Sequence, residues 1–315
     1  MQITAASLAA LFFTFDNSYQ AGLTSAAPWH QNVATEVPSS GESVTYPLLD
    51  KIPRLRKWLP GAERVAQNAS LRGYTLVNDD YELTVEVDRN KIEDDLYGAY
   101  VPMMQMMGTQ AALWPGDLLT TVMQLGAAAA SLCYDGQPFF STAHPVNIDG
   151  TIAGTYSNYS ATGLALNPAN YNTARAAMAS FNGADGKPLG IMPNLLVVPP
   201  QLEQAARQIL NADFIAPAVA FGGNAANQMQ TNTLKGSAEM LVVPQLANEP
   251  TAWYLLVTNL PIKPFVFQRR KTPTFQQYTD PSSPDVFKRR KYVYGTDARG
   301  AAGYTLPILA YRALA

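Results

Sequence analysis

The sequence predicts a mixed α+β protein with one dominant helix and several strands. Residues 75–89 (TLVNDDYELTVEVDR) alternate apolar and polar side chains, with Leu83, Val85 and Val87 on one face, which is typical of a half-buried strand. Residues 93–133 carry apolar side chains at helical spacing. Further apolar runs typical of strands are PNLLVVPP, AEMLVVPQL and AWYLLVTNL. A chain of 315 residues can bury these elements in two lobes.

The N-terminus begins with apolar residues that predict a short amphipathic helix. The residues at helical spacing are Ala6, Leu8, Ala9, Leu11, Phe12 and Phe15. A signal peptide would need a positive leading region, but no Lys or Arg precedes Lys51. Asp16 interrupts the apolar run before the roughly 18 residues that a membrane span needs. We therefore expect an intracellular product without a membrane partner, whose N-terminal segment docks as an arm.

The central helix should begin with the acidic residues at 93–95, which suit the positive end of a helix dipole. Pro102 fits a position in the first turn, whereas Pro115 should kink or restart the helix. The helix should then continue to Cys133 and stop at Asp135-Gly136. Residues 137–170 are expected to be rich in loops.

The second half of the chain alternates helices and strands. A helix should be capped by Asn167 or Asn170 and end at Gly183, and another should start at Pro200 after a buried strand. Near the C-terminus, PFVFQRR and KRRKYVYGTDARG should form a ribbon of two strands joined by the loop DPSSPD.

Composition limits the function. Charged residues make up 15% of the chain, against about 25% in ordinary soluble domains. Wide subunit interfaces would explain this, because interface cores are depleted in charge; a large monomer rich in Gly and Pro is the alternative. One cysteine allows no intramolecular disulfide, and only two histidines nearly exclude a four-ligand His/Cys metal site. A net charge of −2 argues against a phosphate-neutralising protein, but not against a container that encloses DNA.

Charge is segregated along the chain. Residues 51–72 hold six basic side chains against Glu63, and residues 79–95 are strongly acidic. We call residues 51–72 the basic limb and residues 79–95 the acidic limb, and we expect a turn near Gly73 between them. The two limbs could pair in one hairpin, pair with neighbouring copies, or lie on solvated faces. The candidate inter-subunit residues are Lys51, Arg54, Arg56, Lys57, Trp58, Arg64, Arg72, Asp79, Asp80, Glu82 and Glu86.

A second basic region lies in the C-terminal ribbon. It could contact another subunit or face DNA. Its candidate residues are Arg269, Arg270, Lys271, Lys288, Arg289, Arg290 and Lys291.

No pattern predicts a catalytic, cofactor or metal site. The pair of Cys133 and His144 is the only thiol-based candidate for a nucleophile, and no second orienting group is evident. FGGNAANQ lacks the Lys-Ser/Thr of a phosphate loop. Glu93, Asp94 and Asp95 could attract a cation, but consecutive side chains on a helix diverge. The glycosylation patterns at Asn68 and Asn158 are interpreted as chance.

Several long motifs resemble the major head subunit of Mu-like phages. They are YELTVEVDRNKIEDDLYGAY, LCYDGQPFFSTAHPV, LGIMPNLLVVPPQLEQAARQIL, AWYLLVTNLPIKPFVFQRRKTP and YGTDARGAAGY, in the family's order from about Tyr46 onward. The resemblance implies a Hong Kong 97-type capsid fold. It implies an N-terminal arm at 1–44, an E-loop with the first peripheral strands at 45–92, a peripheral domain with a spine helix at 93–149, an axial domain at 150–260, and a return to the peripheral domain at 261–315.

The resemblance also implies a function and partners. Copies would self-assemble as hexamers and pentamers of an icosahedral phage head enclosing double-stranded DNA without sequence-specific contact, assembled in the host bacterial cytoplasm and residing in the virion. A separate scaffolding or protease protein, a portal and a decoration protein are expected partners. No Lys/Asn crosslinking pair is identifiable. The alternatives are an encapsulin-type nanocompartment shell and a hydrolase that uses Cys133.

Overall fold

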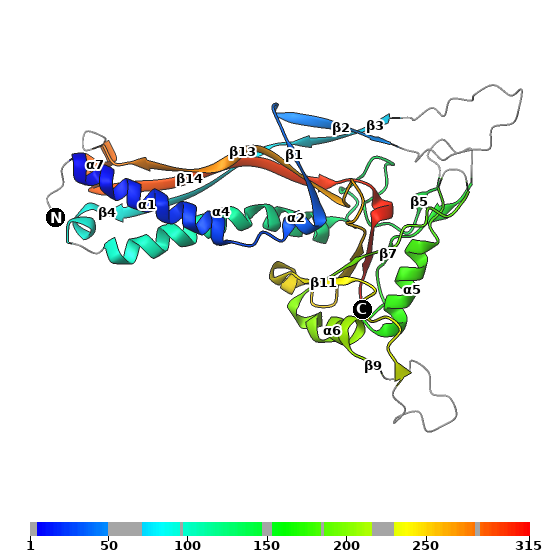
Figure 1. Ribbon diagram of the computed structural model, residues 1–315. Coiled ribbons are helices and arrows are strands. Elements are labelled where there is room, and N and C mark those ends of the chain that lie inside the picture. The colour runs from blue at the N-terminus through cyan, green and yellow to red at the C-terminus, as the bar shows by residue number, and fades with distance from the viewer. Residues whose placement is uncertain are drawn as a thin grey trace, which may run out of the picture.

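The computed structural model describes residues 5–49, 71–94, 97–146, 153–183, 186–215, 230–280 and 284–315. They form an elongated lobe, in which long helices lie along a sheet, and a second lobe near one end of it (Figure 1). The mixed order of helices and strands confirms the predicted α+β class. Among the described residues, no helix combines the length and apolarity needed to cross a membrane.

The elongated lobe contains a four-stranded sheet in the order β1-β13-β14-β4. Its strands are β1 (Ala34–Pro38), β4 (Asp79–Asp88), β13 (Phe265–Tyr278) and β14 (Lys291–Tyr304). β13 and β14 are antiparallel and form the predicted C-terminal ribbon, followed by β4 at the edge. β1 runs parallel to β13 on the other side. The predicted strand at 75–89 is confirmed from Asp79 to Asp88 as β4, whereas Thr75–Val77 belong to β3. Val87 is buried as expected, but Leu83 is exposed.

Helices α1 (Ala5–Ser25) and α4 (Tyr97–Leu125) lie side by side along one face of this sheet (Figure 1). They approach closely because both carry a glycine at the contact: a Cβ on Gly22 would lie 1.9 Å from the Gln105 carbonyl oxygen, and one on Gly108 would lie 2.0 Å from the Tyr19 carbonyl oxygen. The predicted N-terminal helix is confirmed, but it spans 21 residues and docks on its own chain.

The long helix differs from its prediction at both ends. Glu93 ends a separate short helix, α3 (Arg89–Glu93), and Pro102 lies inside α4 instead of in its first turn. The helix passes Pro115 without restarting, and it ends at Leu125, well before Cys133. Tertiary contacts set this end. The Tyr304 hydroxyl donates to the Val122 carbonyl at 2.9 Å and an Arg312 guanidinium nitrogen donates to the Gln124 carbonyl at 3.0 Å.

A two-stranded hairpin lies on the sheet face opposite the helices (Figure 1). Its strands are β2 (Ser43–Leu49) and β3 (Leu71–Val77). Gly73 pairs with Pro47 in mid-strand, so the turn predicted near Gly73 is wrong. A Cβ on Gly73 would lie 2.7 Å from Thr45 Cγ2, so a larger residue at this position would displace the Thr45 side chain. The acidic limb joins the main sheet as β4, where it pairs with β14.

The second lobe is built on a five-stranded sheet in the order β11-β8-β12-β15-β7. The strands are β7 (Tyr159–Ser160), β8 (Leu195–Val198), β11 (Glu239–Val242), β12 (Trp253–Leu256) and β15 (Ala310–Ala313). Their apolar runs were all predicted except β7 and β15. Because β15 pairs with β12, the end of the chain lies in this lobe, which corrects the expected return of the whole 261–315 segment to the lobe of the long helix.

Helices α5 (Pro168–Ala179) and α6 (Glu203–Asn211) belong to the second lobe. The Asn167 side chain accepts a hydrogen bond from the Asn170 backbone N–H at 2.8 Å, which confirms the predicted cap. The helix predicted from Pro200 begins as one 3-10 turn, η1 (Pro200–Leu202), before α6. The smaller elements are α2 (His30–Val33), α7 (Pro284–Arg289), β5 (His144–Pro145), β6 (Thr155–Tyr156), β9 (Phe214–Ile215), β10 (Gln230–Thr231), η3 (Pro244–Asn248) and η4 (Pro307–Leu309).

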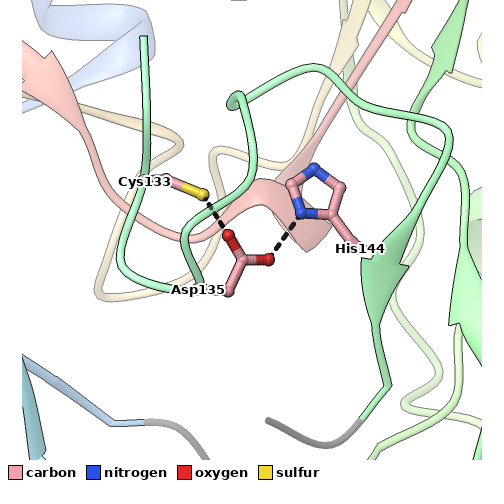
Figure 2. A group of neighbouring side chains, drawn as sticks. All are labelled: Cys133, Asp135 and His144. Atoms are coloured by element: carbon pink, nitrogen blue, oxygen red, sulfur yellow. Dashed lines mark hydrogen bonds and ion pairs between the residues drawn. The ribbon is translucent and has the colours of Figure 1, made fainter. Parts of the chain in front are cut away.

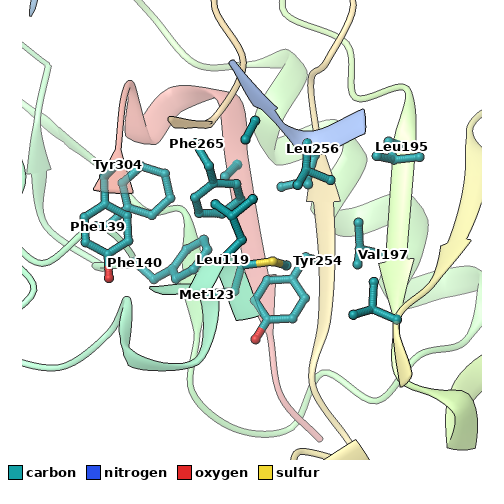
Figure 3. Packing of buried hydrophobic residues seen from close by; sticks show 14 of the residues in the cluster. Leu119, Met123, Phe139, Phe140, Leu195, Val197, Tyr254, Leu256, Phe265 and Tyr304 are labelled. Carbon is teal, nitrogen blue, oxygen red and sulfur yellow. The ribbon is translucent and has the colours of Figure 1, made fainter. Parts of the chain in front are cut away.

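The largest shared core lies where the two lobes meet (Figure 3). α4 contributes Leu119 and Met123, and the ribbon contributes Phe265 and Tyr304. On the second-lobe sheet, alternate side chains of β8 and β12 face this core. The other side chains of these strands face a separate core under α5 and α6. One continuous apolar contact therefore joins the lobes.

Candidate functional site

The hairpin is joined to the main sheet by a buried polar network at its base. The Tyr46 hydroxyl donates to Gln268 Oε1 at 2.7 Å, and Gln268 Nε2 donates to Asn78 Oδ1 at 2.7 Å. Asn78 Nδ2 donates in turn to Ser39 Oγ and to the Gly41 carbonyl, both at 2.9 Å. Gln268 and Asn78 are buried, and burial raises the pKa of Tyr46 above its usual value. Both amide side chains are thus satisfied without water.

A small apolar cluster lies beside this network. Leu76 of β3 packs against Val266 and Ala301 of the ribbon. The ring centroid of Tyr74 lies 6.4 Å from that of Tyr304. These contacts come from the middle of β3 and from the part of it that leads into β4.

Most basic residues predicted for an inter-subunit contact lie in or beside the segment between β2 and β3. Lys51, Arg54, Arg56, Lys57, Trp58 and Arg64 lie outside the described residues. The backbone of Arg72 pairs with Leu48 in the hairpin, and its side chain is also outside the described set. Their contact with a neighbouring copy stays a prediction.

The acidic strand β4 is partly neutralised within its own chain. An Asp80 carboxylate oxygen lies 3.2 Å from Arg299 Nε, and Glu86 pairs with Lys291, which lowers the pKa of Glu86. Glu82 accepts a hydrogen bond from Thr84, and Asp79 is exposed. The acidic limb therefore finds its described cationic partners on β14, across the sheet, and not on the basic limb.

The same pairing changes the interpretation of the basic ribbon. Arg269 lies 2.7 Å from a Glu36 carboxylate oxygen, and Lys271 pairs with Asp297. Arg270 donates to the Ser39 carbonyl at 3.3 Å. Lys288, Arg289 and Arg290 are exposed around the end of α7. The ribbon thus offers less uncompensated charge to DNA than its sequence suggested.

Cys133, Asp135 and His144 form a buried cluster after the end of α4 (Figure 2). The Cys133 thiol donates to Asp135 Oδ1 at 2.8 Å, and His144 Nδ1 lies 2.6 Å from Asp135 Oδ2. His144 Nε2 faces the Phe139 carbonyl oxygen at 3.1 Å. Burial and the neighbouring Asp135 raise the pKa of the thiol. Burial alone would raise the pKa of Asp135, but hydrogen bonds from His144 and Cys133 outweigh it and lower that pKa.

This geometry does not support nucleophilic or metal chemistry. The carboxylate lies between the thiol and the imidazole, so His144 does not contact the sulfur as a general base would. The separations of 2.6 and 2.8 Å are hydrogen-bond distances, whereas two ligands held at about 2.0–2.3 Å from a tetrahedral zinc ion lie more than about 3 Å apart. The cluster instead fixes the loop that leads from α4 to the second lobe.

The remaining chemical candidates from the sequence are the two glycosylation patterns, the acidic residues at 93–95 and the glycine-rich segment FGGNAANQ. Asn158 is fully buried: its amide donates to the carbonyls of Phe139 and Pro307, and its Oδ1 accepts from the Ser141 N–H, so this asparagine is not open to glycosylation. Asp94 follows the end of α3, while FGGNAANQ, Asn68 and Asp95 lie outside the described residues.

The chain was compared with known families and proteins. It matches the family described as "Mu-like prophage major head subunit gpT" over residues 8–165, 158–246 and 247–315. The chain belongs to this family.

Relatives of this head subunit agree with the match. The major capsid protein of Escherichia phage Mu is 31% identical, over 78% of this chain and 100% of the phage protein. The FluMu prophage major head subunit of Haemophilus influenzae is 27% identical, over 94% of this chain and 69% of that protein. A solved procapsid of bacteriophage JBD30 matches with a TM-score of 0.60 and 28% identity, over 99% of this chain and 76% of that one.

This head subunit is therefore the major capsid protein of a tailed phage, a virion component with the Hong Kong 97-type fold. The resemblance drawn from the motifs is confirmed. The comparisons favour the phage shell over the nanocompartment alternative.

Sequence reasoning missed two features of the head subunit. One is the network through Gln268, whose side-chain partners lie 190 and 222 residues away in the chain. The other is Arg312, which forms a bidentate pair with Glu249, 63 residues away. No local pattern marks either feature, because a buried amide or guanidinium shows its role only once its partners are placed.

Proposed function

We propose that copies of this head subunit join as hexamers and pentamers of an icosahedral shell that encloses double-stranded DNA, and that the basic segment 51–72 contacts a neighbouring copy. The observation that supports this contact is the hairpin itself. Its two strands lead to and from that segment, and the hairpin lies on the sheet face opposite the helices, where it is not covered by the described part of its own chain's helical layer. A segment placed on that face is available to an adjacent subunit.

The distribution of charge supports a contact between the basic segment of one copy and the acidic strand β4 of the next. Residues 51–72 hold six basic side chains against one acid. β4 presents Asp79 and Glu82 without a cationic partner among the described residues. Complementary charges of this kind favour the correct partner and register. Many contacts of modest strength, each repeated by symmetry, then add up to a durable shell.

The remaining partners belong to the same proposal. We expect a separate scaffolding or protease protein and a portal during assembly in the host bacterial cytoplasm, and DNA that is enclosed without base-specific contact. A decoration protein is a further candidate, since the JBD30 capsid has been solved decorated with minor capsid protein trimers. We propose no catalytic activity, because the raised thiol pKa and the intervening Asp135 disfavour the hydrolase alternative.

Electron microscopy of the purified chain tests the proposal. We expect closed particles, or free hexamers and pentamers, under at least one condition of salt and crowding. A chain that sediments only as a monomer across low salt, high salt and added polymer would refute self-assembly. Nucleic acid extracted from particles made in infected cells should be double-stranded and unselected in sequence.

A further inference from the structure

Two connections join the hairpin to the main sheet: one between β1 and β2, and one between β3 and β4. The side chain of Asn78 links these two connections by hydrogen bonds. Asn78 is itself the connection between β3 and β4. Its side chain donates to Ser39 Oγ and to the Gly41 carbonyl in the connection between β1 and β2. Its backbone N–H donates to the Glu42 carbonyl at 2.9 Å in the same connection. The two chain crossings therefore cannot move independently.

Gln268 fixes this pair of crossings to the central ribbon. It belongs to β13, pairs in register with Ala301 of β14, and is fully buried. Its amide group connects Asn78 on one side to Tyr46 of β2 on the other. Because a buried polar group left without a partner is costly, this network favours one arrangement of the hairpin.

The apolar contacts beside the network are less specific. Leu76, Val266 and Ala301 make a patch of small and aliphatic side chains, whose attraction is non-directional. Hydrogen bonds are directional, since they weaken steeply when bent. The network is therefore the more orientation-specific of the two contacts between hairpin and sheet.

We propose that the Tyr46–Gln268–Asn78 network holds the hairpin within the narrow range of angles to the sheet at which rings of five and of six copies both close. This inference rests on the proposed assembly through the hairpin. In a ring of identical subunits, a head-to-tail contact closes only when the rotation between copies fits the ring, and otherwise gives open helical products. A change of hairpin angle alters that rotation. These side chains are positioning residues, since they act through the segment that the hairpin carries.

The first experiment measures the angle in the unassembled chain. Spin labels at Thr45→Cys on the hairpin and Thr84→Cys on β4 report the distance between hairpin and sheet, since both threonines are exposed and the native Cys133 is buried. We expect one narrow distance distribution in the parent chain. Asn78→Ala should broaden or shift it, and Tyr46→Phe, which removes one hydrogen bond and keeps the ring, should have a smaller effect.

Asn232→Ala is the matched control. Asn232 is also buried, and its side chain donates to the carbonyls of Ile209 and Ala212 and accepts from the Leu234 N–H, all within the second lobe. Its loss should lower the melting temperature to a similar degree and leave the distance distribution unchanged. General destabilisation is thereby separated from loss of positioning.

The second experiment examines the assembly products by electron microscopy. Asn78→Ala should replace closed particles with open sheets, tubes or particles of mixed size, while Asn232→Ala chains that remain folded should close as the parent does. The inference is overturned if Asn78→Ala keeps the parent distance distribution, or if it changes the angle and still gives closed particles of parent size. If the parent forms no particles at all, the proposed assembly fails, and the distance measurement still decides whether the network sets the angle.

Discussion

The buried Arg312 and the partly buried Glu249 form an ion pair at the meeting point of the two lobes. Arg312 Nη2 lies 2.9 and 2.8 Å from the two carboxylate oxygens, and Nη1 donates to the Gln124 carbonyl at the end of α4. The guanidinium also lies 5.8 Å from the ring centroids of Tyr159 and Tyr254. One side chain thus joins α4, the segment before β12, and the C-terminal strand.

Removing the carboxylate charge should therefore destabilise the junction strongly. Glu249→Gln leaves Arg312, only 5% exposed, without its counter-charge. Breaking a buried pair from one side costs on the order of 3 kcal/mol. Urea unfolding at neutral pH measures this loss. Glu203→Gln is the control, because its pair with Arg207 lies on the surface of α6 and should contribute less than about 1 kcal/mol. Equal losses from the two variants would contradict the assignment.

The close contact between α1 and α4 should depend on the absence of a side chain at Gly108. Gly108→Ala places a methyl group 2.0 Å from the Tyr19 carbonyl oxygen, so α1 must separate from α4 and expose Phe15 and Tyr19. We expect poor folding, or a chain whose N-terminal segment is cut rapidly by protease.

Gly98 of the same helix is the comparison, because an alanine there should stabilise the chain instead of destabilising it. Nothing lies within 4 Å of a Cβ at Gly98, so Gly98→Ala should stabilise the chain by about 0.5–1 kcal/mol through helix propensity. Limited proteolysis and thermal melting compare the two variants. A Gly108→Ala chain as resistant as the parent would show that the helices can separate without loss.

Asp135 should make the fold sensitive to acid. Its folded pKa is lowered from 3.8, since hydrogen bonds from His144 and Cys133 outweigh burial. The ionised carboxylate therefore stabilises the fold above the unfolded pKa, and this contribution is lost as pH falls through the folded pKa. Asp135→Asn should lower the free energy of unfolding at pH 7 by about 1.5–3 kcal/mol. The difference from the parent should shrink below about pH 4. A constant difference from pH 7 to pH 3 would argue against this role.

The Cys133 thiol should be unreactive in the folded chain. It is buried, it donates a hydrogen bond to Asp135, and its pKa is raised. A thiol reagent at pH 8 should modify it only at the rate at which the chain opens, and fully in denaturant. Cys133→Ser should still assemble. Rapid stoichiometric labelling of the native chain would revive the hypothesis of a reactive cysteine.

Local patterns predicted individual elements well and their partners poorly. The alternation around Leu83 predicted β4, and Asn167 predicted the start of α5, because both signals are contained within a few residues. The pairing of β4 with β14 joins residues about 200 positions apart, as in the contact between Lys291 and Glu86, and no spacing rule reaches that far. The basic and acidic limbs adjoin in sequence, so pairing within one hairpin is one of the alternatives that the sequence offers, whereas the sheet places another basic strand, β14, beside the acidic one.

Two single residues show the same limit. The sequence predicts a turn near Gly73, but the structure places this glycine in mid-strand, where a Cβ would lie 2.7 Å from Thr45 Cγ2 across the hairpin. Gly126 follows the end of α4, where a Cβ would lie 2.7 Å from the Phe140 ring, and this contact comes from a loop whose path the sequence did not reveal. A glycine shows that space is needed and does not show which neighbour needs it.

Charge reversal in the hairpin segment should block assembly without unfolding the chain. Arg54→Glu with Arg56→Glu turns two of the six basic residues of 51–72 acidic, so an attraction between neighbouring copies becomes a repulsion. Unassembled chains should keep the parent melting temperature, while the yield of particles falls by at least about tenfold, because the loss at one contact is repeated at every copy of the shell. High salt should weaken assembly of the parent and partly relieve the defect, because ions screen both effects.

A matched reversal of Lys235, whose exposed pair with Asp213 lies in the second lobe, should leave the yield unchanged. Particles formed as readily by the Arg54/Arg56 variant as by the parent would show that the basic segment does not mediate the contact.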